Sequence, residues 1–387
     1  MALTLTAVAR ALSVSPATLR RWVAEGIVPL RDGEWTPSAL AQARIVARMR
    51  ARGQSLDQLR RAAKEGRLAY GYLEDLFPPG EGAYGLDEAA RRTGLEPELI
   101  RRVWAAAGFS AGSLEQLTED DLLLLRRFAA VLDAGLPLVA FLQLVRVYGL
   151  ALAQIADAEV KLFHLYVHEP LIRDGAPVLD IAESLADLTS EVLPLAGPIM
   201  DAAHRKLLRH FLEQDVVGHL ELASDEAALG RVRVAIAFAD LAGYTRLTEE
   251  AGEEEALEVV ERFVALVGET LPDDARVIKT IGDEVMVVGS EPAALADWAV
   301  GMVERSTARP RPRIGLHVGS ALYRDGDYYG RAVNLAARVG ARATGGEVLV
   351  TRPVKEAAGR NLTFTAIGAV KLKGFDEATE LFLAAAR

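Results

Sequence analysis

The chain has 387 residues, of which 51% are hydrophobic, so it is long enough for two or three domains with cores of ordinary size. It contains no cysteine, which excludes disulfides, thiolate zinc sites and thiol catalysis. The formal net charge of -10 is unevenly spread, because residues 1–78 carry 12 Lys and Arg against 7 Asp and Glu, a net charge of +5 that leaves -15 for the rest.

Charged residues interrupt the apolar stretches of the chain. The most apolar stretch, Leu122 to Val145, is interrupted by Arg126, Arg127 and Asp133. A membrane-spanning helix needs about 20 consecutive residues that are mainly apolar. The first 14 residues have neither a basic leader nor a small-residue cleavage site. We therefore expect a cytoplasmic protein with no membrane span.

The basic segment begins with a pattern of two short helices. Residues 5–11 predict a helix, and Val14-Ser15 predicts a turn. Pro16 then suits the first turn of a second helix, with Ser15 as its N-cap. Residues 42–49 and 56–63 predict two further helices of the same module.

This segment, LSVSPATLRRWVAEGIVP, resembles the helix-turn-helix of MerR-type regulators, and Trp35-Thr36-Pro37 resembles the wing. Arg20 and Arg21 lie on the second helix, where a DNA reader needs them. The resemblance implies a winged helix-turn-helix over residues 1–78 and makes DNA a candidate partner. Winged helices also serve as packing and dimerisation modules, so a purely structural role stays open.

A Pro- and Gly-rich break at residues 77–82 separates this module from a second helical region, expected over residues 83–221. Residues 84–110 repeat the pattern of two short helices, with Thr93-Gly94-Leu95-Glu96-Pro97 in the place of Val14-Ser15-Pro16, which suggests a weak internal duplication. Residues 118–220 predict nearly continuous helices interrupted at Gly135-Leu136-Pro137.

Four of the six histidines lie in this helical region, as two pairs spaced by four and by six residues: His164 with His168, and His204 with His210. Histidine changes charge near neutral pH, so a pH switch is one interpretation. The alternative is that all four are partly buried polar residues with local hydrogen bonds. A metal site at His164 and His168 is less favoured, because no carboxylate completes an H-E-x-x-H pattern.

After a polar linker at residues 222–230, the segment 231–387 predicts a mixed α+β domain. We expect a βαββαβ order, a ferredoxin-like sheet with helices on one face. The expected elements are a strand at 233–241, a helix at 245–270, a hairpin at 277–288, a helix at 292–305 and a strand at 313–320. Later elements are a helix after the turn at 328–330, a strand at 347–351 and a terminal pair around VKLKG and ELFLAAA.

Polar side chains stand at the ends of these elements. Asp240 ends the first strand and Asp283 lies at the tip of the hairpin. Asn334 and Arg338 are four residues apart, so on a helix they share one face and can grip one oxyanion, with Asp327 just ahead of them.

Three ordered motifs contain these residues, F-x-D-L-x-G-Y-T at Phe238 to Thr245, K-T-I-G-D at Lys279 to Asp283, and D-Y-Y-G-x-x-V-N-x-A-x-R at Asp327 to Arg338. Together they resemble the class III nucleotidyl cyclases, over about residues 231–385. The helical region ahead of them resembles the regulatory domain of a bacterial cyclase subfamily whose members include pH-responsive and fatty-acid-binding enzymes. The resemblance makes a proton or a fatty acid a candidate regulatory ligand.

The resemblance implies that Asp240, Asp283 and the Leu241 carbonyl hold two Mg2+ or Mn2+ ions at each site. The backbone amides of Ala242, Gly243, Tyr244 and Thr245 would then hold the β and γ phosphates at a helix start.

The remaining implied roles belong to the second subunit of a homodimer. Lys279 and Asp327 would read the adenine edge and so favour ATP over GTP. Asn334 would orient the ribose, and Arg338 would stabilise the transition state. Lys371, or else Lys373, would hold the terminal phosphates, because VKLKGFDEATE is two residues longer here than the usual spacing.

The sequence therefore predicts a multi-domain protein, with an all-α N-terminal region formed by a winged helix-turn-helix and a helical bundle, followed by an α+β ferredoxin-like cyclase domain. The predicted function is a homodimeric adenylate cyclase that converts ATP to cyclic AMP and pyrophosphate. The alternative is a DNA-binding transcription regulator whose cyclase-like domain only dimerises or senses ATP.

Overall fold

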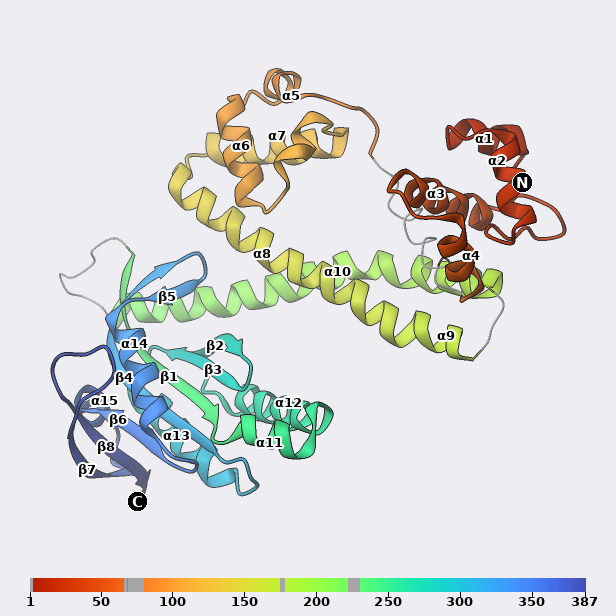
Figure 1. Ribbon diagram of the computed structural model, residues 1–387. Helices are drawn as coiled ribbons and strands as arrows, with labels where there is room; N and C mark the ends of the chain where they lie inside the picture. Colours follow the sequence, from red (N-terminus) through yellow and green to blue (C-terminus); the bar gives the residue numbers. More distant parts are fainter. Residues whose placement is uncertain (1–2, 66–67, 69–79, 175–177, 222–229) are drawn as a thin grey trace. The chain divides into compact units, whose positions relative to one another are not determined.

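The computed structural model describes residues 3–65, 68, 80–174, 178–221 and 230–387. The chain divides into two compact units, residues 1–208 and 209–387 (Figure 1). The predicted linker at 222–230 lies almost wholly outside the described residues, as does the first half of the break at 77–82.

The first helices begin where the sequence places them. Helix α1 spans Leu5–Ala11, and α2 spans Pro16–Ala24 with Pro16 in its first turn. The Ser15 hydroxyl caps α2 by accepting a hydrogen bond from the Thr18 amide at 3.1 Å. Helices α3 and α4 follow, at Pro37–Ala51 and Leu56–Lys64, and both extend beyond the predicted bounds. Their apolar faces meet in one core, which includes Leu19, Trp22, Ile27, Val46 and Leu59.

A second core lies in the helices that follow. Its buried side chains include Ile100, Val103, Leu122, Leu125 and Phe141. The predicted helix start at Thr118 is a capping box, because Thr118 and Asp121 each bond the other's backbone amide. The helices of this region are α5 (Leu86–Thr93), α6 (Pro97–Ala106), the 3-10 turn η2 (Ala111–Glu115), α7 (Glu119–Asp133), α8 (Leu138–Phe163), the π-helical turn η3 (His164–His168), α9 (Glu169–Arg173) and α10 (Val178–Glu221).

One helical segment in the described part of the chain, Leu138–Arg173, is long and apolar enough to cross a membrane by length and composition. It begins after the predicted break at Gly135-Leu136-Pro137 and so differs from Leu122 to Val145, the stretch singled out from the sequence. Only 17% of its most apolar window is buried. Interface helices of soluble proteins meet the same criterion, so the absence of a membrane span stays a prediction.

The second unit is built on one mixed sheet in the order β2-β3-β1-β4-β6-β8-β7, with β5 paired to β4. Both neighbours of β1 run antiparallel to it, and β6 runs parallel to β4. The predicted α+β class is therefore confirmed. The strands are β1 (Arg231–Leu241), β2 (Ala275–Ile281), β3 (Glu284–Gly289), β4 (Pro312–Arg324), β5 (Asp327–Tyr329), β6 (Val348–Thr351), β7 (Leu362–Val370) and β8 (Thr379–Ala386).

Helices cover the central strands on both faces, and not on one face as the sequence suggested. Odd-numbered β1 residues such as Ala237 join a core with α12 (Glu253–Thr270) and α13 (Pro292–Arg305). Even-numbered residues such as Ile236 pack with α14 (Arg331–Arg342) on the opposite face. This alternation explains why β1 is an unbroken apolar run, since both of its faces are buried.

Three predicted elements differ in detail. The helix expected at 245–270 is two helices, α11 (Tyr244–Ala251) and α12, because Gly252 has φ 95° and breaks the helical path. Asp327–Tyr329 is not a turn but strand β5, and the turn precedes it at Asp325-Gly326. Strand β7, the first of the predicted terminal pair, ends at Val370, so most of VKLKG lies in the following loop. The short helix α15 (Arg352–Ala357) was not predicted.

Helix α14 approaches β4 closely at a pair of glycines. A Cβ on Gly315 would lie 1.9 Å from the backbone nitrogen of Gly340. Backbone atoms cannot rotate away as a side chain can, so only glycine permits this approach. The position of α14, and of its exposed Asn334 and Arg338, therefore depends on Gly315.

We predict that Gly315→Ala destabilises the protein by about 1–3 kcal/mol, through overpacking of α14 against β4. Gly268→Ala is the matched control, because Gly268 lies in α12 with open space around its Cβ position. That change should instead stabilise by about 0.5–1 kcal/mol. Urea denaturation of both variants checks the opposite signs, and a neutral Gly315→Ala would contradict the close packing.

Candidate active site

The two predicted metal-binding carboxylates lie together. Asp240 is at the end of β1, and Asp283 is in the turn between β2 and β3. Burial raises the pKa of Asp283 to about 7, and a hydrogen bond to Asp240 and the repulsion of its charge add to the rise. Burial, together with the neighbouring Asp240 carboxylate, therefore favours the protonated form of Asp283 up to about neutral pH.

These donors fit a divalent cation. Two carboxylates and the Leu241 carbonyl are oxygen ligands, and they leave coordination positions for phosphate oxygens, which is how Mg2+ is usually held. Within the described residues, no group of three or more His, Cys, Asp or Glu gathers as a metal site. A cation here would thus depend on Asp240, Asp283 and the substrate itself.

Arg313 is a site residue that sequence reasoning missed. Its Nε lies 2.7 Å from Oδ2 of Asp240, and its Nη2 contacts the same oxygen. The antiparallel register of β1 and β4 places the two residues directly opposite each other. A signal was present, because an Arg at the start of a strand that pairs antiparallel with β1 must face a residue near the end of β1.

The predicted base-reading pair is also brought together. Lys279 on β2 donates a hydrogen bond to Asp327 on β5, and these residues are 48 apart in sequence. The other Asp327 oxygen accepts the amide of Tyr328 at 2.7 Å. Arg276, also on β2, donates to the buried Tyr328 hydroxyl at 2.5 Å. Two contacts between β2 and β5 therefore hold the carboxylate of Asp327 in place.

Asn334 and Arg338 are exposed on one face of α14, as their spacing predicts. The opposite face is buried against the sheet, through residues that include Val333, Ala336 and Val339. Arg338 is near enough to Glu284, the residue after Asp283, to oppose the rise that burial causes in the pKa of that carboxyl. The two side chains are thus available to a ligand on the outer side of α14.

The predicted phosphate-binding amides are only partly available. The Ala242 amide donates to the Arg311 carbonyl at 3.0 Å, so Ala242 does not offer its N–H to a ligand. Gly243 is the N-cap of α11 and has no side-chain capping bond. The set of amides at this helix start therefore narrows to Gly243, Tyr244 and Thr245.

Lys371 and Lys373 flank Leu372 in the loop after β7. Leu372 is buried with Phe375 in a small core that also contains Val339, whereas both lysines are exposed. The anchored loop presents the two ammonium groups to solvent, and this arrangement favours neither of them as the phosphate ligand.

The histidines of the helical region are arranged differently in the two pairs. In η3 the Nδ1 atoms of His164 and His168 lie 3.1 Å apart, and His168 is only 1% exposed. His204 and His210 are both exposed on α10, and His210 contacts Gln214. The interpretation of all four as partly buried is therefore wrong for the second pair.

Comparison with known proteins identifies the family of this chain. Residues 230–385 match the family model of the adenylate and guanylate cyclase catalytic domain, and residues 25–212 match that of the adenylate cyclase regulatory domain. The chain is 33% identical over 283 residues to the pH-sensitive adenylate cyclase MT1302 of Mycobacterium tuberculosis, covering 70% of this chain and 69% of that protein. The chain belongs to the class III adenylate cyclases.

Two other proteins resemble this cyclase. An adenylate cyclase of Streptomyces coelicolor is 33% identical over 284 residues, covering 72% of each chain. The crystal structure of the adenylyl cyclase CyaB from P. aeruginosa matches 41% of this cyclase and 95% of that chain, at 20% identity and a TM-score of 0.36.

The raised pKa of Asp283 predicts a pH-dependent effect on stability without metal. The neutral form is favoured in the folded state, so the stabilisation is complete below the ordinary value of 3.8 and is lost as the pH rises to about 7. Asp283→Asn removes this titration. The Tm of the variant minus that of the wild type, measured in EDTA, should increase between pH 4 and 7 and level off above pH 7. A difference that does not change with pH would contradict the close carboxyl pair.

Proposed function

We propose that this cyclase converts ATP to 3',5'-cyclic AMP and pyrophosphate by two-metal catalysis at the interface of a homodimer. The observation that carries the proposal is the contact between Asp240 and Asp283, which gives the end of β1 an oxygen site for Mg2+ or Mn2+. Two metals, when bound, would lower the pKa of the ribose 3'-hydroxyl and stabilise the leaving pyrophosphate. The 3'-hydroxyl would lose its proton to solvent and its oxygen would form a bond to the α-phosphorus. The bond from that phosphorus to the oxygen that bridges to the β-phosphate would break, so that pyrophosphate leaves.

The residues of this chain bind and orient the nucleotide. Arg313 forms a salt bridge with Asp240. If a cation were bound at Asp240, the guanidinium of Arg313 would be available to the polyphosphate, because Arg is well suited to bidentate binding of phosphate. The amides of Gly243 to Thr245 bind further phosphate oxygens at the start of α11.

Lys279 and Asp327 give the base site its selectivity. Lysine donates to N1 of adenine, and the Asp327 carboxylate accepts from the 6-amino group. Guanine has a donor at N1 and an acceptor at position 6, so the same pair disfavours GTP. The salt bridge between Lys279 and Asp327 holds both side chains aligned before the base enters.

Asn334 and Arg338 complete the site from the second subunit. The exposed face of α14 can hold the ribose with the amide and the pentavalent α-phosphate with the guanidinium. Each homodimer then has two equivalent composite sites, and in each one the carboxylates come from one chain and α14 from the other. The enzyme is favoured over a cyclase-like domain that only dimerises or senses ATP, because every residue of the catalytic set is present.

Complementation tests the shared sites directly. Asp240→Ala and Arg338→Ala should each be nearly inactive as homodimers, because every site lacks one essential group. Mixing them with subunit exchange should restore about a quarter of wild-type activity, since half of the dimers are mixed and each keeps one intact site of two. Cyclic AMP production with Mn2+ is the measurement.

A mixture of Asp240→Ala with Asp283→Ala is the matched control, because both defects lie in the same half-site and no intact site can form. Recovery limited to the first mixture supports the composite site. If neither mixture recovers although subunit exchange is shown by mass spectrometry, the residues act within one chain.

The closely spaced histidine pair favours the proton as a regulatory ligand of the helical region. The two Nδ1 atoms of His164 and His168 are 3.1 Å apart, so they can share only one proton between them. Glu169 lies beside the pair, with an oxygen 3.6 Å from Nε2 of His164. Protonation therefore changes the charge at one irregular turn of a long helical segment.

His164→Gln combined with His168→Gln should flatten the ratio of cyclase activity at pH 6 to that at pH 8. His204→Gln with His210→Gln is the control, because those side chains are exposed on α10, and it should leave the ratio within about twofold of the wild type. Equal ratios in all three proteins would exclude the His164 and His168 pair as the sensor.

A further inference from the structure

The N-terminal region contains the same structural unit twice. In the first copy a bridge joins Leu3 to Trp35, around α1 and α2, and α3 follows. In the second copy a bridge joins Tyr84 to Leu117, around α5 and α6, and α7 follows. Helices α3 and α7 each have 15 residues and begin after a threonine N-cap.

The two copies align with a nearly constant offset. Pro16 and Pro97, each in the first turn of the second helix, are 81 residues apart, and the N-caps Thr36 and Thr118 are 82 apart. Core positions also correspond at these offsets. The pairs buried in both copies include Leu19 with Ile100, Trp22 with Val103, Ala43 with Leu125, Leu59 with Phe141, and Ala63 with Val145.

The surfaces of the two copies have opposite charge. Residues 3–64 contain 11 Lys and Arg against 4 Asp and Glu, a net charge of +7. Residues 84–145 are the equivalent segment of the same length, at an offset of 81. They contain 6 Lys and Arg against 9 Asp and Glu, a net charge of -3. A shared fold does not require this difference, so it points to a polyanionic partner for the first copy alone.

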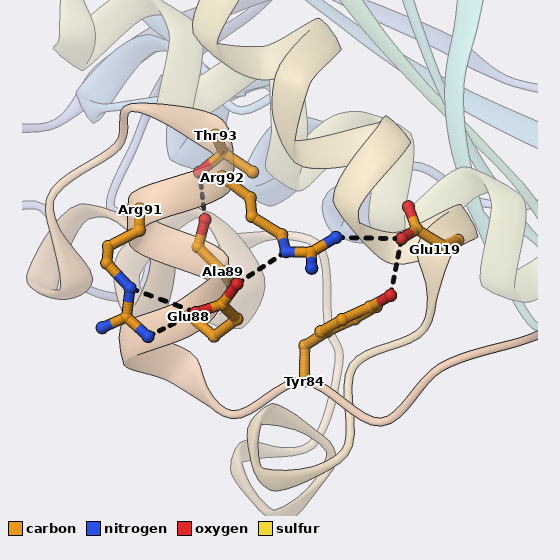
Figure 2. Close-up of polar contacts among 7 residues, drawn as sticks. All are labelled: Tyr84, Glu88, Ala89, Arg91, Arg92, Thr93 and Glu119. Carbon is orange, nitrogen blue, oxygen red and sulfur yellow. Dashed lines mark hydrogen bonds and ion pairs between the residues drawn. The ribbon is translucent and has the colours of Figure 1, made fainter.

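In the second copy the arginines of the first helix are neutralised by its own carboxylates. Figure 2 shows Glu88 bound by both Arg91 and Arg92, and Glu119 contacted by Arg92 and by the Tyr84 hydroxyl. These contacts lower the pKa of Glu88 and raise that of Arg92. Acidic residues also occupy the first turns of α5, α6 and α7.

In the first copy the corresponding positions lack these carboxylates. Arg10 takes the place of Arg91, and no acidic residue occurs in the first turn of α1, α2 or α3. Arg20, at the place of Arg101, is exposed on α2, and Arg101 by contrast pairs with Glu98. A carboxylate in the first turn of α2 would repel a phosphate that approaches the positive end of this helix, so its absence there favours phosphate binding.

We propose that the first copy, residues 3–64, binds the phosphate backbone of double-stranded DNA through α1 and α2, and that the second copy does not. Two helices joined by the four residues 12–15 form a helix-turn-helix, and its second helix has the dimensions of the major groove. An A-form RNA duplex has a deep and narrow major groove that does not admit a helix.

The test is the salt dependence of DNA binding by the full-length protein. Fluorescence anisotropy with a labelled 30-base-pair DNA duplex of mixed sequence gives the association constant between 50 and 200 mM KCl. If Arg10→Ala combined with Arg20→Ala removes two phosphate contacts, the slope of log K against log salt concentration should become less negative by about 1.8.

The second copy supplies a matched control. Arg91→Ala combined with Arg101→Ala removes the same charge from the same structural positions and should leave the slope unchanged. Cyclic AMP production by both variants checks that they remain folded. No binding by the wild type at 50 mM KCl, an equal loss in both variants, or equal affinity for an RNA duplex of the same sequence would each overturn the proposal.

Discussion

The catalytic domain is organised around an unfavourable interaction, the approach of two carboxyl groups at the end of β1. Asp240 and Asp283 come from segments 43 residues apart in sequence, and the antiparallel pairing of β1 with β3 brings them into contact. Burial and mutual repulsion keep a proton on Asp283 up to about neutral pH. The apolar faces of β1 compensate, since Ala237 and Ile236 are buried against helices on opposite sides of the sheet. A stable core thus holds together two carboxyl groups whose repulsion is reduced by the proton on Asp283 and by the guanidinium of Arg313 beside Asp240.

Strand β1 also positions helix α14. Asp240 follows Ile236 and Phe238 in the alternation of β1 and therefore belongs to the face covered by α14. Helix α14 reaches that face closely because Gly315 and Gly340 have no side chains between the two backbones. Asn334 and Arg338 remain exposed on the outer side of α14.

Strand ends and helix faces were predictable from the sequence. The pattern of apolar residues defines where a strand ends, and a spacing of four residues defines the face of a helix. The position of Asp240, the exposed row of Asn334 and Arg338, and the cap at Ser15 all follow from such local rules. Long-range pairings were not predictable in this way. The donation of the Ala242 amide to Arg311 and the salt bridge from Arg313 to Asp240 depend on how β4 lies beside β1. The break at Gly252 could not be predicted without the φ angle of this residue, because an isolated glycine in a helical pattern is often tolerated.

The salt bridge between Arg313 and Asp240 also has a consequence for product release. Under the proposed mechanism, a metal-bound polyphosphate would have to displace the guanidinium from Asp240, so the free energy of re-forming that ion pair would be subtracted from the affinity for substrate and product alike. ATP would offset this loss through the proposed base contacts with Lys279 and Asp327, which pyrophosphate cannot make. The ion pair would therefore favour release of the product over release of the substrate.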